Sequence, residues 1–367
     1  NSCAAYDFKH RAIIDTIAGY QQGSVVPCIP GVIPYKLSSN ENPYEPLESV
    51  KKVLEENAIP QINRYPEMRC TDICRRIAEL NNVSLDNVVA GSGSTEVIVQ
   101  LVSVVAGAGD EIIYPWRSFE AYPIIIAASG ATGVPVPLAS DGRHDIDAMI
   151  AAINSRTRLV VVNNPNNPTG APVTRGEVSR LMDAVPEDVL VLFDEAYFQF
   201  NTDPERSIAR DIFDEYPNVV IAQTFSKAYG LAGLRIGYGI AQPEIVSAML
   251  KVALPFGVSD LAQKAALASL DALDELQNRV DAIVAERKRV MGALRGQGWL
   301  SVPESQANYF WLPLGSRTAE AAARFRAQSL AVRAFDGEGI RVSIGVPEAN
   351  DAVIEVCAGL SADGFVR

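Results

Sequence analysis

Short, continuous apolar runs alternate with helix-length segments between about residues 88 and 224, and this alternation constrains the fold more than any other feature of the sequence. The apolar runs are VVA at 88–90, EIIYP at 111–115, LVVV at 159–162, VLVLF at 189–193 and VVIA at 219–222. Helical patterns near 118–128, 145–154 and 174–184 separate them. Because strands joined by crossover helices are buried on both faces, they lack polar alternation and lie parallel. The sequence therefore predicts an α/β fold with a mostly parallel sheet.

The pattern changes on either side of this region, which predicts three parts. Residues 1–44 form an irregular lead segment, rich in Gly and Pro, that we expect to lie across another domain or subunit. Residues 45–255 form the large domain with the sheet. Residues 256–367 combine long helices with the strand-like runs NYFWLPL, LAVRAF and IRVSIG, which indicates a smaller α+β C-terminal domain.

Composition excludes several classes of function. The net charge of −12 argues against a nucleic-acid or membrane surface, since both need basic patches. Two histidines leave little for a zinc site, so no metal is expected. Five cysteines form no CxxC pair; Cys70 and Cys74 lie one turn apart on a predicted helix, as core thiols. With no signal-peptide pattern and no 18-residue apolar run, we expect a cytoplasmic protein.

Polar clusters follow four of the predicted strands. They are GSGST at 91–95, NNPNNPTG at 163–170, DEAY at 194–197 and the Ser226-Lys227 pair. In an open parallel sheet, ligands bind at the carboxyl ends of the strands. We therefore expect these four clusters to converge on one pocket.

One end of this pocket is predicted to bind an anion. By itself, the GSGST turn is also compatible with an ordinary strand-to-helix connection. Glu96 stands where a dinucleotide-binding fingerprint would have its third glycine, so that fingerprint is not matched. Free N–H groups at a helix N-terminus nevertheless suit a phosphate dianion. Thr224, Ser226 and Arg235 could complete such a cradle, the arginine by a bidentate contact.

Asp194 and Lys227 indicate the chemistry. Asp194 follows five apolar residues, and a buried carboxylate needs a partner, whether in a salt bridge, in a helix cap or on a protonated heterocyclic nitrogen. The last is what pyridoxal phosphate requires as an electron sink. Tyr197 and Asn167 can donate hydrogen bonds to its phenolate oxygen. Lys227 is then the covalent anchor, with a pKa lowered by desolvation, and its position directly after a buried strand disfavours a solvated surface lysine.

Several runs resemble known families over nearly the whole chain from about Tyr20. NNPNNPTG, DEAY and TFSKAYGLAGLRIGYG resemble the signatures of fold-type I, pyridoxal-phosphate-dependent aminotransferases. SSNENPY, NRYPE, QANYFWLPLG and EGIRVSIGVPEAND are similar to the histidinol-phosphate aminotransferase family. PWRSFEAYP and KVALPFGVSDLAQKAALASLDALDEL resemble its aromatic amino acid aminotransferase branch.

The resemblance implies roles around the cofactor. Lys227 matches the Schiff-base lysine, Asp194 the partner of the pyridine nitrogen, and Tyr197 and Asn167 the donors to the phenolate oxygen. The matching phosphate ligands are Ser94, Thr95, Thr224, Ser226 and Arg235. Phe119 stands where the family usually has a ring-stacking tyrosine, so stacking is kept and the hydroxyl is lost. Tyr65 resembles a residue that reaches the cofactor phosphate of the other subunit, which implies a homodimer.

The resemblance also implies substrate contacts. Arg341 resembles the arginine that binds the substrate α-carboxylate, the alternative being an arginine on a strand surface. Arg333 and Asn40 match further carboxylate or side-chain contacts, and Tyr20 is expected at the side-chain pocket.

These features predict an aminotransferase with a ping-pong mechanism, moving the amino group of an aromatic amino acid to 2-oxoglutarate. Trp116, Phe119, Tyr122 and Tyr20 could form the apolar pocket. The rival donor is histidinol phosphate, whose phosphate could bind Arg117 or Arg333. More distant alternatives are a non-catalytic ligand sensor and a decarboxylase or lyase on the same fold.

Overall fold

The computed structural model describes residues 8–366, so the predicted lead segment begins outside the described part. A seven-stranded sheet dominates it, with the order β2-β8-β7-β6-β5-β3-β4. Its strands are β2 Val88–Gly91, β3 Glu111–Trp116, β4 Thr132–Pro137, β5 Thr157–Asn163, β6 Leu190–Asp194, β7 Val219–Thr224 and β8 Gly237–Ile240. Strands β3 to β7 pair in parallel, and β8 is antiparallel to both neighbours. The predicted α/β fold with a mostly parallel sheet is confirmed.

Strand β8 is not among the apolar runs from which the sheet is predicted, because it contains glycine at two of its four positions. Gly237 and Gly239 belong to this strand. A Cβ on Gly237 would collide with the backbone of Ser94, and one on Gly239 would press on Val97. Here glycine therefore allows β8 to approach the start of the neighbouring helix α3 closely.

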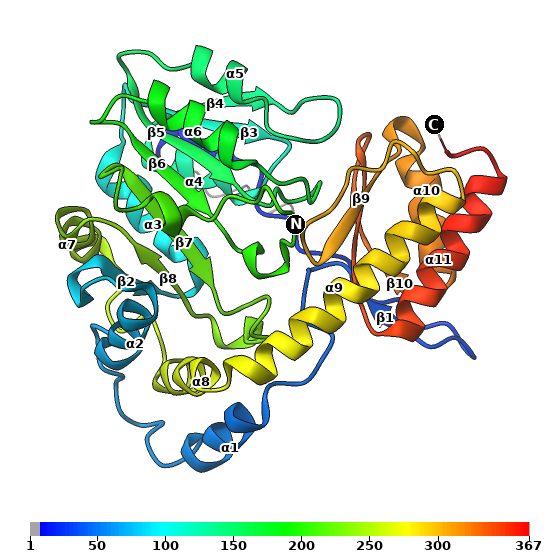
Figure 1. Ribbon diagram of the computed structural model, residues 1–367, viewed down its shortest axis with the longest axis horizontal. Helices are drawn as coiled ribbons and strands as arrows, with labels where there is room; N and C mark the ends of the chain where they lie inside the picture. The colour runs from blue at the N-terminus through cyan, green and yellow to red at the C-terminus, as the bar shows by residue number, and fades with distance from the viewer. Residues whose placement is uncertain (1–7, 367) are drawn as a thin grey trace.

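The central strands are buried because helices cover both faces of the sheet (Figure 1). Every residue of β7 is buried, and on β6 Val191 and Phe193 face one apolar cluster while Leu192 faces the other. Each such aliphatic or aromatic side chain contributes roughly 1.5–3 kcal/mol on burial. The helices α3 Gly93–Val105, α4 Ala121–Ser129 and α7 Pro243–Val252 contribute to one cluster. The helices α2 Thr71–Asn81, α5 Ile146–Ala151, α6 Arg175–Ala184 and α8 Asp260–Leu270 contribute to the other.

Local sequence explains where several helices begin. Thr174 caps α6 in a reciprocal capping box with Glu177, and Asp145 caps α5. On α2, Cys74 is buried within the helix and Cys70, just before its first residue, is buried with left-handed backbone angles. Both cysteines thus lie in the core, as predicted.

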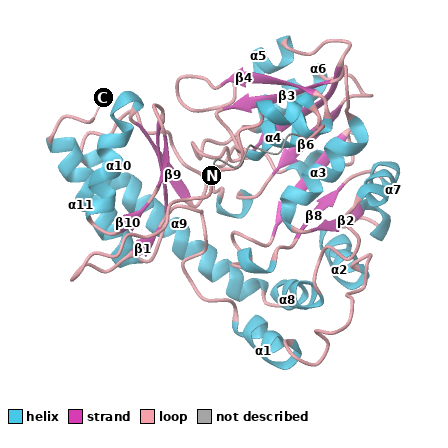
Figure 2. Cartoon of the chain, turned by 180° about the vertical axis from the view of Figure 1, so that it is seen from behind, coloured by secondary structure: helices cyan, strands magenta, loops and turns pink. Residues whose placement is uncertain are grey.

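The last third of the chain builds a second layer of structure beside the large sheet (Figures 1 and 2). A three-stranded antiparallel sheet has the order β11-β12-β9, from Arg333–Phe335, Gly339–Ser343 and Tyr309–Pro313. The helices here are α9 Leu273–Gly296, α10 Thr318–Ala327 and α11 Pro347–Ala362. The long helix α9 runs from the region of α8 toward this sheet (Figure 1).

The lead segment joins this C-terminal part. Strand β1 Tyr35–Lys36 pairs in parallel with β10 Leu330–Ala331. Helix α1 Glu48–Asn57 follows it and packs against α8. The remaining short elements are 3₁₀ turns at Ala12–Thr16, Leu85–Asn87, Phe198–Phe200, Ala209–Ile212, Ala232–Leu234 and Gly315–Arg317. The domain boundaries at residues 44 and 255 stay predictions. Across residues 8–366, no helix combines the length and the apolar character needed to span a membrane.

Candidate active site

The predicted site residues meet in one cavity of about 280 Å³ at the carboxyl ends of the parallel strands. It is lined by Tyr20, Asn40, Ser94, Thr95, Phe119, Asn167, Asp194, Tyr197, Thr224, Ser226, Lys227, Arg235, Arg333 and Arg341. The expected convergence of the four strand-end clusters is confirmed. Tyr65 lies elsewhere, and so do Trp116, Tyr122 and Arg117, which are predicted for the side-chain pocket or for a substrate phosphate.

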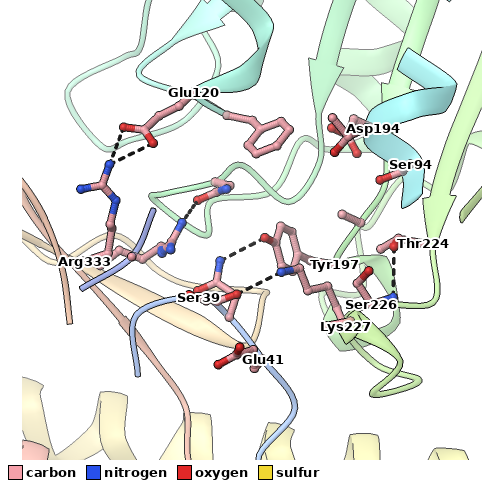
Figure 3. Close-up of a pocket in the computed structure, with 18 of the residues that line it drawn as sticks. Ser39, Glu41, Ser94, Glu120, Asp194, Tyr197, Thr224, Ser226, Lys227 and Arg333 are labelled. Carbon is pink, nitrogen blue, oxygen red and sulfur yellow. Dashed lines mark hydrogen bonds and ion pairs between the residues drawn. The ribbon is translucent and has the colours of Figure 1, made fainter. Parts of the chain in front are cut away.

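Lys227 enters the cavity from the loop after β7 (Figure 3). Its side chain is partly buried, and its Nζ donates a hydrogen bond to the backbone carbonyl of Ser39 at 3.0 Å. Burial, followed by the positive charge of Arg341, lowers the pKa of the Lys227 amine to about 8. A larger fraction of this lysine is therefore neutral and nucleophilic near physiological pH than of an ordinary lysine.

Asp194 ends strand β6 and is 4% exposed. Its Oδ2 accepts a hydrogen bond from the hydroxyl of Tyr122, while its Oδ1 is buried without a partner. Burial raises the pKa of this carboxyl to about 6, although the bond from Tyr122 lowers it. A buried oxygen without a donor is costly, so the site is suited to a ligand that brings an N–H group to Asp194.

Two separate sets of hydrogen bonds hold Tyr197 and Arg341 in the wall of the cavity. Asn40 donates to the hydroxyl of Tyr197 at 3.0 Å. Arg341 donates from Nη1 to Oδ1 of Asn167 at 2.8 Å and from Nη2 to the carbonyl of Ser38 at 2.7 Å. Arg341 is 8% exposed, which excludes the alternative of a strand-surface arginine, and its Nε has no partner. These contacts hold the guanidinium group in place at the cavity wall.

The opposite end of the cavity gathers donors suited to an anion. Ser94 and Thr95 belong to the first turn of α3, where backbone N–H groups are free of helical partners. The Oγ1 of Thr224 accepts a hydrogen bond from the N–H of Ser226 at 3.0 Å, and Arg235 donates to Oγ of Ser226 at 3.3 Å. Figure 3 shows Ser94, Thr224 and Ser226 on the same side, with Lys227 and Tyr197 between them and Arg333.

Gly93 makes this arrangement possible. Its φ of +76° lies in the left-handed region, and a Cβ at this position would collide with the guanidinium of Arg235. Only glycine satisfies both conditions without strain. The glycine-rich turn thus lets Arg235 approach the start of α3.

The end of the cavity that is expected to bind the substrate side chain, the side-chain end, differs in part from the prediction. Tyr20 and Phe119 line it, with ring centroids 6.2 Å apart in an edge-on arrangement. The prediction that Trp116 and Tyr122 also line it is wrong. Tyr122 is 1% exposed and its hydroxyl is committed to Asp194, while Trp116 lines a neighbouring cavity beside Tyr20.

Arg333 lies in the cavity wall, where it forms an ion pair with Glu120. Its Nη2 is 2.7 Å from Oε1 and 2.9 Å from Oε2 of that carboxylate. Arg117 is paired in the same way, with Glu338. Both candidates for binding a substrate phosphate are therefore already neutralised by a carboxylate.

Tyr65 lies outside the cavity on an exposed surface. Its side chain is 83% exposed and stacks on Phe256, with ring centroids 4.6 Å apart. Of the residues predicted to bind the cofactor, Tyr65 is thus the one that does not line the cavity of its own chain.

Eleven further residues line the cavity without having been predicted as site residues, among them Ser38, Ser39, Glu41, Glu120, Asn163 and Phe335. Ser38, Ser39 and Glu41 lie in the SSNENPY run, Glu120 in PWRSFEAYP and Asn163 at a strand end, so those runs contain the signal that could identify them. Phe335 has no comparable signal, because its place depends on how β11 packs beside the large sheet.

Comparisons with known proteins agree with this geometry. The family model of aminotransferase class I and II matches residues 32–356. The aromatic amino acid aminotransferase of Streptomyces avermitilis is 51% identical over 348 residues, which are 95% of this chain and 96% of that protein. The enzyme of the same name from Cutibacterium acnes is 48% identical over 345 residues, 94% of this chain and 96% of that protein.

Solved structures match over a similar extent. The histidinol-phosphate aminotransferase from Sinorhizobium meliloti, in complex with pyridoxal-5'-phosphate, has a TM-score of 0.84 and 25% identity over 98% of each chain. Aspartate aminotransferase from Thermus thermophilus, with maleate, has a TM-score of 0.78 over 90% of this chain and 92% of that one. At 22% identity, the latter shows the fold alone.

Sheet, cavity and structural matches define the fold-type I aminotransferase architecture. The chain belongs to the aminotransferase class I and II family. It is an enzyme of the transaminase type, so a non-catalytic ligand sensor is excluded.

Proposed function

We propose that this enzyme uses pyridoxal phosphate to transfer the amino group of an aromatic L-amino acid to 2-oxoglutarate in two half-reactions. The proposal rests on the set of functional groups that line one cavity. This cavity holds an amine of lowered pKa, on Lys227, and a buried carboxylate oxygen without a donor, on Asp194. The anion-binding end formed by Ser94, Thr224 and Arg235 completes the set.

These residues fit the cofactor group by group. Asp194 would accept the N–H of a protonated pyridine ring, and this partner would satisfy its unpaired Oδ1. Ser94, Thr224 and Arg235 would hold the phosphate, since N–H groups at a helix N-terminus and a guanidinium favour a dianion. Lys227 would form the covalent bond to the aldehyde carbon.

Bound there, pyridoxal phosphate supplies an electron sink for the charge that develops at the substrate Cα. Lys227 would take the proton from the substrate Cα, because its lowered pKa suits a general base near neutral pH. Asp194 would keep the ring nitrogen protonated. Arg341 would bind the α-carboxylate and so fix the direction of the Cα–H bond.

The aromatic donor is supported by the walls of the cavity and by the named relatives. Tyr20, Phe119 and Phe335 supply aromatic surface at the side-chain end. Arg333, which could bind the phosphate of such a donor, is held by Glu120, and Arg117 is paired with Glu338 and does not line the cavity. Relatives at 51% and 48% identity carry the name aromatic amino acid aminotransferase. These observations favour an aromatic donor over histidinol phosphate.

A half-reaction tests the proposal. The purified enzyme with pyridoxal phosphate should show a visible absorption band that disappears on adding L-phenylalanine alone, with one phenylpyruvate released per site. Adding 2-oxoglutarate should then restore the band. An enzyme that releases phenylpyruvate only when both substrates are present together would contradict the two-step order.

Replacement of Arg341 should damage substrate binding selectively. Arg341→Gln should lower kcat/KM for L-phenylalanine by about 10²–10³-fold, since each hydrogen bond to a charged group contributes about 1.5–3 kcal/mol. The variant should also lose most of its preference for L-phenylalanine over 2-phenylethylamine, which has no carboxylate. Steady-state kinetics with both amines measures this, with Arg326→Gln on the exposed side of α10 as the control. An unchanged preference would exclude Arg341 as the carboxylate ligand.

We also propose that the enzyme is a homodimer in which Tyr65 contacts the cofactor phosphate bound by the partner subunit. Exposed apolar side chains surround Tyr65 in sequence: Ile59 is 82% exposed, Ile62 78% and Met68 63%. Solvent-exposed apolar groups of this number mark an interaction surface. The absence of Tyr65 from the cavity of its own chain supports a role on the other subunit.

Subunit mixing tests the role of Tyr65. Tyr65→Ala should bind pyridoxal phosphate about tenfold more weakly, from the loss of one hydrogen bond to a charged group. Mixed dimers of this variant with an inactive Lys227→Ala chain should recover activity, because one of their two sites contains both native residues. If Tyr65 acted within its own chain, the mixture would show no recovery.

A further inference from the structure

The Arg333–Glu120 ion pair is built into the wall that faces the substrate side chain. Arg333 begins strand β11, and Glu120 directly precedes α4. Both residues line the cavity, and their side chains are only 14% and 21% exposed. Figure 3 shows the pair at the end of the cavity opposite Ser94 and Thr224.

The contacts of Arg333 pair its positive charge with Glu120. One Nη2 group serves both carboxylate oxygens of Glu120, and Nη1 donates to the carbonyl of Ala334 at 2.9 Å. The guanidinium carbon also lies 4.6 Å from the ring centroid of Phe335. A substrate with an anionic side chain would therefore either displace Glu120 or lie beside its carboxylate.

A neutral aromatic side chain meets no such obstacle. It can lie against Tyr20, Phe119 and Phe335 while the ion pair stays intact. Because the pair is partly buried, breaking it to admit an anion would leave one charge without its partner. The wall thus discriminates by charge as well as by shape.

We propose that Glu120 determines specificity by holding Arg333, so that substrates with an anionic side chain bind weakly. This inference rests on the proposed function, since it concerns the side-chain end of the same cavity. Like charges brought together at a binding site are a common means of rejecting the wrong partner. The acceptor 2-oxoglutarate also has a distal carboxylate, so its KM is raised by the same residue.

The test compares single-turnover half-reactions with L-phenylalanine and with L-histidinol phosphate. The loss of the visible absorption band monitors each reaction. Glu120→Gln keeps the shape and removes the charge. It should raise the ratio of the second-order rate constant for histidinol phosphate to that for phenylalanine by about tenfold or more. It should also lower the KM for 2-oxoglutarate. The double variant Glu120→Gln with Arg333→Gln should lose this gain, because the freed arginine is its source.

The second ion pair of this region supplies a matched control. Glu338→Gln frees Arg117, and neither residue lines the cavity, so the ratio should stay within about twofold of wild type. A ratio in Glu120→Gln no higher than in this control, or a gain that persists in the double variant, would overturn the inference. A wild-type enzyme that does not react with L-phenylalanine would instead contradict the proposed function, whatever the variants show.

Discussion

Lys227→Ala is expected to lower kcat for L-phenylalanine by about 10³-fold or more, because it removes the covalent anchor and the general base together. The amine lies in the cavity beside the carbonyl of Ser39, and no other lysine within residues 8–366 lines that cavity. Phenylpyruvate formation measures the loss. After borohydride reduction, the wild-type peptide that contains Lys227 should carry the mass of the cofactor, and the variant should carry none.

The control and the pH dependence make this prediction specific. Lys288→Ala removes an exposed lysine of α9 and should leave kcat within about twofold of wild type. In the cofactor-free enzyme, covalent attachment should speed up with pH and level off above about pH 8, since only the neutral amine attacks an aldehyde and burial lowers the pKa of Lys227 to about 8. A rate that still rises tenfold between pH 8 and pH 10, as for an ordinary lysine with a pKa of about 10.4, would contradict the assignment.

Asp194→Asn should lower kcat by about 10²–10³-fold, the usual effect of removing one electrostatic contact that acts at the transition state. The amide keeps the shape and can still accept the hydrogen bond from Tyr122, so the loss reports the charge. Turnover of L-phenylalanine measures it.

A cofactor analogue separates this role from a structural one. Reconstitution of Asp194→Asn with pyridoxal phosphate methylated on the ring nitrogen, which is permanently cationic, should recover a large part of kcat. Asp188→Asn, exposed just before β6, is the matched control and should behave as wild type. Equal turnover with both cofactors in the Asn variant would mean that Asp194 does not act on the ring nitrogen.

The convergence of the site could be predicted from the sequence because it follows from topology. Asp194 and Thr224 each end a buried strand, and parallel strands present their carboxyl ends at one edge of a sheet. Once the apolar runs identify the strands, the polar residues after them must lie close together. The fold class follows from the same alternation of strands and helices.

The orientations of individual side chains could not be predicted in this way. Tyr122 and Glu120 lie two residues apart at the start of α4, yet one reaches Asp194 below the cavity and the other reaches Arg333 at its wall. The rotation of α4 on the sheet decides which residue faces which partner, and tertiary packing fixes that rotation. Strand β8 could not be predicted for a related reason. The sequence alone does not distinguish a glycine that allows close packing in a strand from a glycine in a loop.

The choice of amino donor is tested most directly by steady-state kinetics with 2-oxoglutarate as acceptor. The aromatic walls and the paired Arg333 predict that kcat/KM for L-phenylalanine exceeds that for L-histidinol phosphate by at least about tenfold, a difference of about 1.4 kcal/mol in transition-state binding. A kcat/KM for L-histidinol phosphate well above that for L-phenylalanine would contradict the account.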